Sequence, residues 1–445
     1  MVKFDKDFLF GTATASYQVE GAYNEDGRGM SIWDTFCRKE GKVLNGATGD
    51  VACDHYHRYK QDVSMMKDIG VNAYRFSIAW PRIFPQKGEF NQKGLDFYKR
   101  LVDELLNNGI KPCATIYHWD LPQWLDDIGG WLNRDVVNWY GEYAEKLFSE
   151  LGSYIDMWIT LNEPWCSSFL GYYTGAHAPG HKDFKEALTA AHHLLLSHGT
   201  AIDAFRELNI NDSKIGITLN LTPVYPKTDS KDDKEAAVLA DGCSNRWFLD
   251  PVFKGAYPKD IEKLIGDIFG ELDFVRNGDL KTISQQVDFL GINYYSRAIV
   301  EKGNDGMFNV KFSEGPGKKT DMGWEISPES LYLLLTRLKN EYTGKLPLYI
   351  TENGAAFKDK VSTDSHVHDP ERVEYLKEHL HNAGRFIEEG GNLKGYFLWS
   401  LMDNFEWAYG YSKRFGIVYV DYKTQKRILK DSALWYKKLI SERTL

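Results

Sequence analysis

Two glutamates stand at the ends of short apolar segments of the chain. Glu163 follows residues 155–161 in WITLNEPW, and Glu352 follows residues 347–351 in LYITENGA. A carboxylate in such a place is costly to bury unless it has a partner. A single glutamate of this kind would most simply cap a strand or pair with an arginine. Two of them, each beside an asparagine, instead indicate a pair of carboxyl groups that act together.

Paired carboxyl groups suit the cleavage of a glycosidic bond, which needs one on each side of the scissile bond. One of them must be protonated so that it can donate to the leaving oxygen. The other must be ionised so that it can attack the anomeric carbon. Different surroundings can separate the pKa values of two carboxyl groups in this way. Arg75, in YRFSIAW, could keep one carboxylate ionised by charge pairing.

The elements that must position these residues alternate between strand and helix. Short apolar segments rich in β-branched residues predict strands at residues 8–11, 71–78, 112–118, 155–161, 214–219, 287–292, 347–351 and 395–399. Amphipathic segments predict helices at residues 92–108, 134–151, 184–208, 234–248, 327–342 and 370–389. This alternation favours a parallel sheet.

Eight such units in one unbroken chain predict an α/β fold, a single (β/α)8 TIM barrel over residues 1–445. The alternative is an open, doubly wound sheet. Its phosphate-binding G-x-G-x-x-G after an early strand is missing, so the closed barrel is favoured.

Polar and aromatic residues stand at the ends of the predicted strands. They are Arg75, His118, Trp119, Asn162, Glu163, Asn293, Tyr295, Glu352 and Trp399. In a barrel enzyme the C-terminal ends of the strands converge on the active site. We therefore expect side chains that are far apart in the sequence to gather in one pocket.

Composition argues against several classes of partner. The net charge is −9 and no Lys/Arg run is present, which disfavours nucleic-acid binding. No apolar stretch resembles a signal peptide or a membrane helix, so we expect no membrane partner. The five cysteines are widely spaced and form no C-x-x-C, which is typical of free thiols in a reducing cytoplasm. The His55/His57 and His366/His368 pairs lack a third ligand in a recognised spacing, so no metal is expected.

The chain resembles the family-1 glycoside hydrolases, the β-glucosidases, over essentially its whole length. TLNEP and ITENG look like the two catalytic signatures of that family. Further matching segments are FLFGTATASYQVEGA, RFSIAWPRI, YHWDLPQWL, DFLGINYYS and LWSLMDNFEWAYGYSKRFGIVYVD. The resemblance implies a (β/α)8 barrel, retention of anomeric configuration, no metal and no organic cofactor. It also assigns Glu163 as acid/base and Glu352 as nucleophile.

The resemblance also assigns the sugar-binding residues, one position at a time. Gln18, His118, Asn162, Glu406 and Trp407 match the positions that hold the hydroxyls of the non-reducing sugar, and Trp399 matches the ring under it. Asn293 and Tyr295 match residues near the nucleophile, where the Tyr hydroxyl donates to it. Trp165 and Trp324 fall where the family lines the aglycone side. We count Trp119 and Phe415 with the substrate-binding residues.

The expected function is therefore a retaining β-glycosidase of the β-glucosidase type. Its substrates would be small oligosaccharides or aryl and alkyl β-glycosides with a terminal, non-reducing β-D-glucosyl residue. Galactosyl and fucosyl residues are further candidates. The sequence leaves open the preferred sugar, the aglycone length, the extent of transglycosylation, the thermal optimum and the oligomeric state.

Three alternative functions fit the sequence less well. In a 6-phospho-β-glycosidase the position of Glu406 is typically Ser, followed by a Lys and a Tyr. This chain keeps the lysine as Lys413 but has Glu406 and Phe415 at the other two positions, and a carboxylate would repel a phosphate. A non-catalytic sugar-binding barrel would be expected to lose a catalytic glutamate. A plant-type thioglucosidase usually has Gln in place of Glu163.

Overall fold

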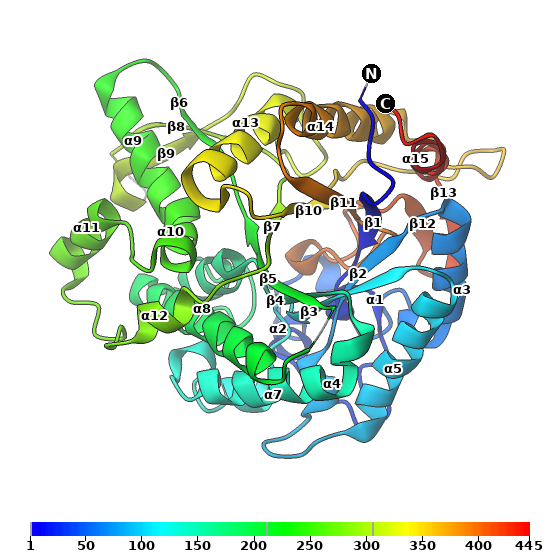
Figure 1. Ribbon diagram of the computed structural model, residues 1–445, viewed down its shortest axis with the longest axis horizontal. Helices are drawn as coiled ribbons and strands as arrows, with labels where there is room; N and C mark the ends of the chain where they lie inside the picture. Colours follow the sequence, from blue (N-terminus) through cyan, green and yellow to red (C-terminus); the bar gives the residue numbers. More distant parts are fainter. Residues whose placement is uncertain (1, 211, 305–306) are drawn as a thin grey trace.

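Eight parallel strands close into a barrel in the computed structural model, which describes residues 2–210, 212–304 and 307–445 (Figure 1). The barrel strands are β1 (Leu9–Ala13), β2 (Ala73–Ser77), β3 (Lys111–Tyr117), β4 (Met157–Asn162), β5 (Lys214–Asn220), β7 (Phe289–Asn293), β10 (Leu348–Asn353) and β11 (Leu393–Trp399). Each strand pairs with the next in this order, and β1 closes the ring against β11. The predicted (β/α)8 barrel is confirmed.

The strands are apolar because helices cover the barrel on the outside and side chains fill it on the inside. Parallel strands that are buried on both faces read as nearly continuous apolar runs. Leu9, Cys113, Met157, Phe289 and Tyr349, all near the beginnings of their strands, form a small core within the barrel. This plug fills the N-terminal end, so the C-terminal end is left for a site.

The α-helices surround the barrel in Figure 1. They are α1 (Ser16–Val19), α2 (Ile32–Cys37), α3 (His55–Ile69), α4 (Trp80–Ile83), α5 (Gln92–Asn107), α6 (Gln123–Asp126), α7 (Val136–Leu151), α8 (Phe184–Glu207), α9 (Lys231–Asp241), α10 (Trp247–Lys254), α11 (Lys259–Phe269), α12 (Asp279–Ile283), α13 (Pro328–Leu338), α14 (Pro370–Glu388) and α15 (Asp431–Glu442). Four of the predicted helices correspond closely to α5, α7, α8 and α14.

The single helix predicted at residues 234–248 is wrong. The chain forms α9, a π-helical turn at Gly242–Arg246 and then α10. Gly242 lies so close to Ile261 of α11 that a Cβ atom there would be 2.4 Å from the Ile261 Cδ1. The helix predicted at residues 327–342 likewise ends as α13 at Leu338, and a π-helical turn, Lys339–Thr343, follows it.

A small sheet lies outside the barrel, beside α9 (Figure 1). Its strands β6 (Val224–Pro226), β8 (Ala298–Lys302) and β9 (Val310–Ser313) pair in the order β6-β8-β9. β6 follows barrel strand β5, and β8 follows barrel strand β7. The sheet is therefore attached to the C-terminal end of the barrel, where it adds to the wall of the cleft described below. A separate hairpin joins β12 (Val418–Asp421) to β13 (Lys426–Leu429).

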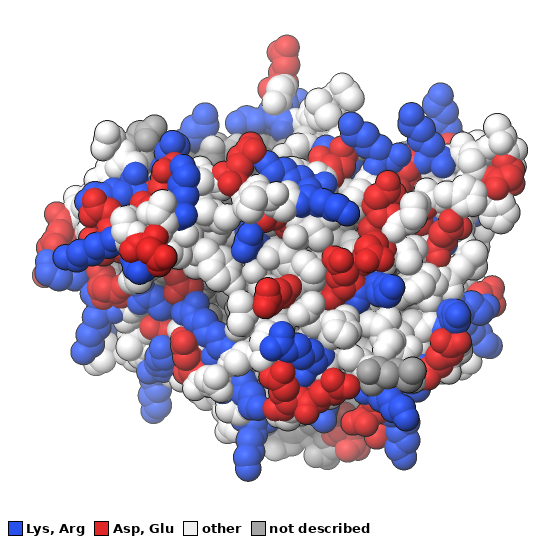
Figure 2. All heavy atoms as spheres, turned by 90° about the horizontal axis from the view of Figure 1, so that it is seen from above, with Lys and Arg blue, Asp and Glu red and all other residues white. Residues whose placement is uncertain are grey.

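Acidic and basic side chains are interspersed over the face of the molecule that Figure 2 shows. Across the part of the chain that the structure describes, no helix is both long and apolar enough to cross a lipid bilayer.

Candidate active site

A cleft with a volume of about 770 Å³ opens at the C-terminal ends of the barrel strands. Of the predicted site residues, those in its walls are His118, Trp119, Glu163, Trp165, Asn293, Tyr295, Trp324, Glu352, Trp399, Glu406, Trp407 and Phe415. Arg75 and Asn162 lie behind the wall, where they are hydrogen bonded to Glu352 and His118, and Gln18 also lies behind it and donates to the backbone oxygen of Phe405. The fold thus gathers residues from strands that are distant in the sequence.

Glu352, in β10, is held by a cation and a hydroxyl. Arg75 Nη1 donates to its Oε1 at 2.5 Å, and the Tyr295 hydroxyl donates to its Oε2 at 2.6 Å. Burial raises the pKa of the Glu352 carboxyl, while the charge of Arg75 and the bond from Tyr295 oppose that rise. Because donors and a positive charge favour the ionised form, this carboxyl is the one suited to carry a negative charge.

Glu163 follows β4 and has neutral partners. Asn293 Nδ2 donates to its Oε1 at 2.6 Å, and the Cys166 thiol donates to its Oε2 at 3.1 Å. Among the described residues no cation forms an ion pair with it. Burial and, after it, the negative charge of Glu352 raise the pKa of Glu163 to about 7. The carboxyl group suited to hold a proton is therefore Glu163, and the two groups differ in the way that an acid and a nucleophile must differ.

Three buried polar atoms at the inner end of the cleft have no hydrogen-bond partner among the described residues. They are Gln18 Oε1, His118 Nδ1 and Glu406 Oε2. Buried polar groups are normally paired, so atoms left free beside a cleft indicate a polar ligand. The side chains offer the mixture of donors and acceptors that sugar hydroxyls require.

The protonation of this inner end is set by burial. Burial and the charge of Arg75 hold the pKa of His118 well below its ordinary value, so its ring is neutral. Burial, followed by the charges of Glu352 and Glu163, raises the pKa of Glu406 to about 8. His118 Nε2 lies 3.0 Å from Asn162 Nδ2, and Asn162 Oδ1 accepts from both Arg75 and Asn293. One network therefore links the sugar-binding candidates to the two glutamates.

Aromatic rings form the floor of the inner end. The Trp119 and Trp407 rings lie 4.6 Å apart, and the His118 ring stacks on Trp399 at 5.9 Å. Trp119, Glu163 and Trp407 all have φ values in the left-handed region, at 76°, 49° and 46°. This conformation is unfavourable for bulky residues and tends to occur at functional sites.

The outer end of the cleft is lined by rings that lie on loops. Trp324, Tyr295 and Phe415 contact one another with centroid distances of 5.3 to 6.1 Å. Trp165 stacks on Phe169 at 5.7 Å. Beyond these rings, Phe312 of β9 lines the mouth and is 65% exposed. This end therefore presents flat apolar faces to any ligand that passes through the mouth of the cleft.

Sequence reasoning missed several residues of the cleft. Cys166 lies three positions after Glu163, a helical spacing that could have indicated contact between the two side chains. His177 and Phe312 lie in the wall as well, but no periodic pattern in their segments marks them. Arg297 and Glu325, also in the wall, form an ion pair that no local motif predicts.

Lys413 is engaged elsewhere. Its Nζ donates to the backbone oxygen of Asp321 at 2.5 Å and to the Asp321 carboxylate at 3.0 Å. Because the sequence keeps this lysine of the phospho-specific pattern, we expected it to be a cation available to a phosphate group. The structure corrects that expectation, because Asp321 already neutralises it.

Three of the four histidines that were considered and rejected as metal ligands have carboxylate partners. His55 pairs with Asp62, His57 with Asp54 and Glu25, and His368 with Asp364 and Asp431. Within residues 2–210, 212–304 and 307–445, no three His, Cys, Asp or Glu side chains are arranged to hold a metal ion.

The chain is similar over its whole length to one family of known proteins. The model of the family "Glycosyl hydrolase family 1" matches residues 1–445. Beta-glucosidase A of Acetivibrio thermocellus is 53% identical, over 99% of this chain and 98% of that protein. A bifunctional beta-D-glucosidase/beta-D-fucosidase of Bifidobacterium breve is 46% identical, over 99% and 98%.

Solved structures agree with these matches. The family 1 beta-glucosidase from Thermotoga maritima superposes with a TM-score of 0.95 at 49% identity and covers 100% of both chains. The GH1 beta-glucosidase from Exiguobacterium antarcticum B7 superposes with a TM-score of 0.97 at 54% identity, over 99% of both chains.

Proposed function

The chain belongs to glycosyl hydrolase family 1, and we propose that it is a β-glucosidase in which Glu163 is the acid/base and Glu352 the nucleophile. The observation that carries the proposal is the difference between the two carboxyl groups. Glu352 accepts hydrogen bonds from Arg75 and Tyr295, whereas Glu163 has only neutral donors. Burial raises the pKa of both carboxyl groups, and the charge of Glu352 adds to the rise at Glu163, whose pKa is about 7. We propose the barrel of residues 1–445 as one catalytic domain that acts in the cytoplasm, where its free cysteines would remain reduced.

In the first step the Glu352 carboxylate attacks the anomeric carbon. A carbon–oxygen bond to the enzyme forms as the glycosidic bond breaks, and Glu163 gives its proton to the leaving oxygen. Arg75 orients the attacking carboxylate, and Tyr295 keeps a hydrogen bond to its second oxygen. The products of this step are a covalent glycosyl-enzyme and a free alcohol.

In the second step water breaks the ester to Glu352. Glu163 is now ionised, and the Asn293 and Cys166 donors stabilise its charge. It takes a proton from the water as the oxygen attacks the anomeric carbon. Because each step inverts that carbon, the sugar leaves with its original configuration.

The inner end of the cleft is proposed to bind the non-reducing sugar. The free atoms of Gln18, His118 and Glu406 meet its hydroxyls, and Trp399 lies under its ring. Two relatives support the choice of sugar and linkage. One is the beta-D-glucosidase/beta-D-fucosidase, and the other is a 1,4-beta-D-glucan glucohydrolase of Thermotoga neapolitana, 49% identical. We propose short β-1,4-glucans and aryl β-glucosides as substrates, with β-fucosides also accepted, and breakdown products of cellulose as the source.

A 6-phosphoglucoside is disfavoured on two grounds. Glu406 lies beside the free sugar-binding atoms, where its carboxylate would repel a phosphate dianion above its pKa of about 8, and where below that pH the neutral carboxyl group supplies no positive charge to bind the dianion. Lys413, the cation that could have offset this repulsion, is paired with Asp321. A sugar-binding barrel without activity is disfavoured because both carboxyl groups line the cleft.

The proposal is tested with a panel of nitrophenyl β-glycosides, with and without 6-phosphate. We expect hydrolysis of the glucoside and the fucoside, little hydrolysis of the phosphorylated glucoside, and release of β-glucose as the first product detected by proton NMR. Release of α-glucose first would contradict the double displacement. A preference for the phosphorylated substrate would contradict the role of Glu406.

A further inference from the structure

Residues 314–326, which we call the aglycone loop, join β9 to α13 and carry Trp324 to the cleft. The loop folds back on itself as a narrow hairpin. Thr320 N donates to Trp324 O at 2.9 Å, and Ile326 N donates to Lys318 O at 2.8 Å. Its turn presents Met322 and Trp324 to the outer end of the cleft. The position of the loop therefore determines where Trp324 stands.

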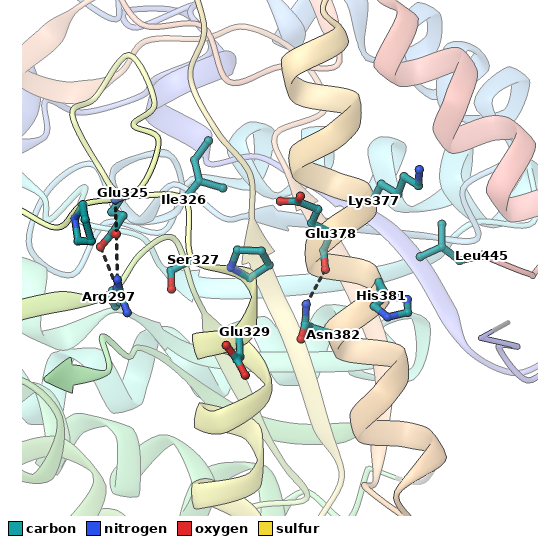
Figure 3. A pocket seen from close by; sticks show the side chains of 13 residues that line it. Arg297, Glu325, Ile326, Ser327, Glu329, Lys377, Glu378, His381, Asn382 and Leu445 are labelled. Carbon is teal, nitrogen blue, oxygen red and sulfur yellow. Dashed lines mark hydrogen bonds and ion pairs between the residues drawn. The ribbon is translucent and has the colours of Figure 1, made fainter.

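The aglycone loop has a hollow on each side. On its inner side lies the cleft, and on its outer side an open groove of about 630 Å³ separates it from α14. Figure 3 shows this groove between Glu325, Ile326 and Ser327 on one side and Lys377, Glu378, His381 and Asn382 on the other. Close packing normally holds a segment in place because neighbours fill both sides. A partition between two hollows has less of this support, so polar contacts add to the packing of Met322 and Trp324 against the barrel core.

The Arg297–Glu325 ion pair ties the base of the loop to the segment that follows Tyr295 (Figure 3), while Lys413 holds Asp321 at the turn. Arg297 donates from Nε at 2.8 Å and from Nη2 at 3.0 Å to the two carboxylate oxygens. Glu325 also accepts from Gly317 N at 2.7 Å, and its backbone oxygen accepts from the Ser296 hydroxyl at 2.8 Å. A two-pronged pair fixes direction as well as distance.

Glycines make room for this carboxylate within the hairpin. A Cβ atom on Gly315 would lie 1.9 Å from Glu325 Oε2, and one on Gly317 would lie 2.6 Å from Glu325 Oε1. The Glu325 side chain is almost fully buried, at 7% exposure. The loop is thus folded around the carboxylate, so displacement of Glu325 from Arg297 would displace the whole hairpin.

Arg297 connects the loop to the catalytic centre. It lies two residues after Tyr295, whose hydroxyl donates to Glu352 and whose ring lies 5.3 Å from that of Trp324. We propose that Arg297 and Glu325 form a positioning pair that sets Trp324 against the leaving part of the substrate and so determines which aglycones are accepted. The proposal rests on the proposed β-glucosidase function. Neither residue is assigned a contact with the sugar that is transferred.

Substrates that differ only in the leaving group test this pair. Glu325→Gln removes the charge, and Arg297→Lys removes the two-pronged geometry. For cellobiose we expect kcat/KM to fall by about tenfold in either variant, mainly through KM, because small displacements of a positioning group are costly. For β-glucosyl fluoride, whose leaving group is one atom, we expect the value to stay within about twofold. An equal fall for both substrates, or no fall for cellobiose, would overturn the proposal.

Two further variants separate positioning from general stability. Asp241→Asn breaks another two-pronged pair, Arg337–Asp241, which does not line the cleft. It should lower the melting temperature about as much as Glu325→Gln does. It should leave unchanged the ratio of kcat/KM for cellobiose over β-glucosyl fluoride. In the Arg297→Lys/Glu325→Gln double variant, cellobiose activity should fall no further than in a single variant, because one interaction is lost once. If the loss of cellobiose activity in the double variant equals the product of the two single losses, the two residues act separately.

The wild-type enzyme distinguishes this inference from the function on which it rests. If the wild type hydrolyses neither substrate, the β-glucosidase function fails. If the wild type hydrolyses both substrates, and the variants change neither the ratio of kcat/KM for cellobiose over β-glucosyl fluoride nor KM for cellobiose, only the positioning pair fails.

Discussion

The two ends of the cleft are built from different parts of the fold. At the inner end His118, Asn162 and Trp399 stand at or next to the ends of barrel strands, and His118 is only 2% exposed. At the outer end Trp324 lies on the aglycone loop, and Phe312 lies on the small sheet outside the barrel and is 65% exposed. The inner end inherits the rigidity of the barrel, whereas the outer end depends on contacts between loops.

The two ends of the cleft also differ in the chemistry that they offer to a substrate. The inner end carries unpaired polar atoms, and a site built to hydrogen bond a substrate rejects one that lacks the matching group by a large factor. The outer end offers apolar rings, and apolar contacts discriminate by only about 1–3 kcal/mol. We therefore expect one sugar to be selected strictly and many aglycones to be tolerated. Substitutions along the cleft should lose less activity the farther out they lie.

The largest effect is expected for Glu352→Ala, between the two ends. Loss of the nucleophile should lower kcat by roughly 10⁴-fold or more, equivalent to about 5.5 kcal/mol of transition-state stabilisation. Added azide should restore turnover and give an inverted, α-configured glucosyl azide, because the anion fills the vacated space and attacks once. Azide rescue with a β-configured product would instead assign residue 352 as the acid/base.

Next in size is Glu406→Ser, at the inner end. Loss of this acceptor should lower kcat/KM for a nitrophenyl glucoside by roughly a hundredfold. The variant also removes the carboxylate that repels phosphate above the Glu406 pKa of about 8, so in that pH range the ratio of kcat/KM for the 6-phosphoglucoside over the glucoside should rise by roughly tenfold, about 1.4 kcal/mol. Because Lys413 is paired with Asp321, this gain must come from the removed carboxylate and not from a new cation.

A Glu406→Ser variant in which both substrates lose activity in parallel would place Glu406 in a supporting role. Circular dichroism would show whether the fold is intact. The additional substitution Asp321→Asn tests the lysine separately, since freeing Lys413 should raise the ratio further.

A smaller effect, on pH dependence, is expected for Cys166→Val. The thiol donates to Glu163, and burial keeps the pKa of Cys166 well above its ordinary value, so the donor is present at neutral pH. A donor to the carboxylate favours the ionised form, so its loss should raise the pKa of Glu163. The alkaline limb of kcat/KM against pH, where the acid loses its proton, should therefore move to higher pH.

Other groups that act on the Glu163 carboxyl stay unchanged in the Cys166→Val variant. They are Glu352, Arg75, Asn293, Glu406 and Tyr295. Cys243→Ser, a thiol outside the cleft wall, serves as the matched control and should leave the profile in place. An alkaline limb that moves to lower pH in Cys166→Val would reject the donor role.

The smallest effect is expected for Phe312→Ala, at the mouth. KM for cellotriose should rise by about threefold or less, equivalent to less than 1 kcal/mol, because an exposed ring contributes modest apolar contact. Cellobiose, which is shorter, should be affected less. A tenfold rise in KM for cellobiose would contradict the difference between the two ends, because the outer wall would then select its ligand as strictly as the inner end.

The sequence predicted the inner end far better than the outer end, and the reason is physical. Buried parallel strands must be apolar along their whole length, so all eight appear as patterns, and the topology of a barrel then brings Glu163 and Glu352 together. The left-handed backbone at Glu163 and the donation from Cys166 are details that no periodicity predicts.

Loop positions depend instead on pairs that are distant in the chain. Arg297 and Glu325 are 28 positions apart, and Lys413 and Asp321 are 92 apart. Each of these side chains alone reads as a solvated surface charge. The same limit applies to the helix predicted at residues 234–248, where contact between Gly242 and Ile261 accompanies the break. Such pairings are properties of the folded chain and are not visible in its local pattern.

The closure of the barrel between β1 and β11 has a consequence for biosynthesis. Strand β1 is translated about 380 residues before its second neighbour, β11, an interval of roughly 20–80 s at ordinary elongation rates. Throughout that interval the nascent sheet has two unpaired edges, which can pair with other chains. Translation pauses before Trp399 would prolong this exposure, so yields in a host cell should depend on elongation speed and on chaperones that shield open sheets.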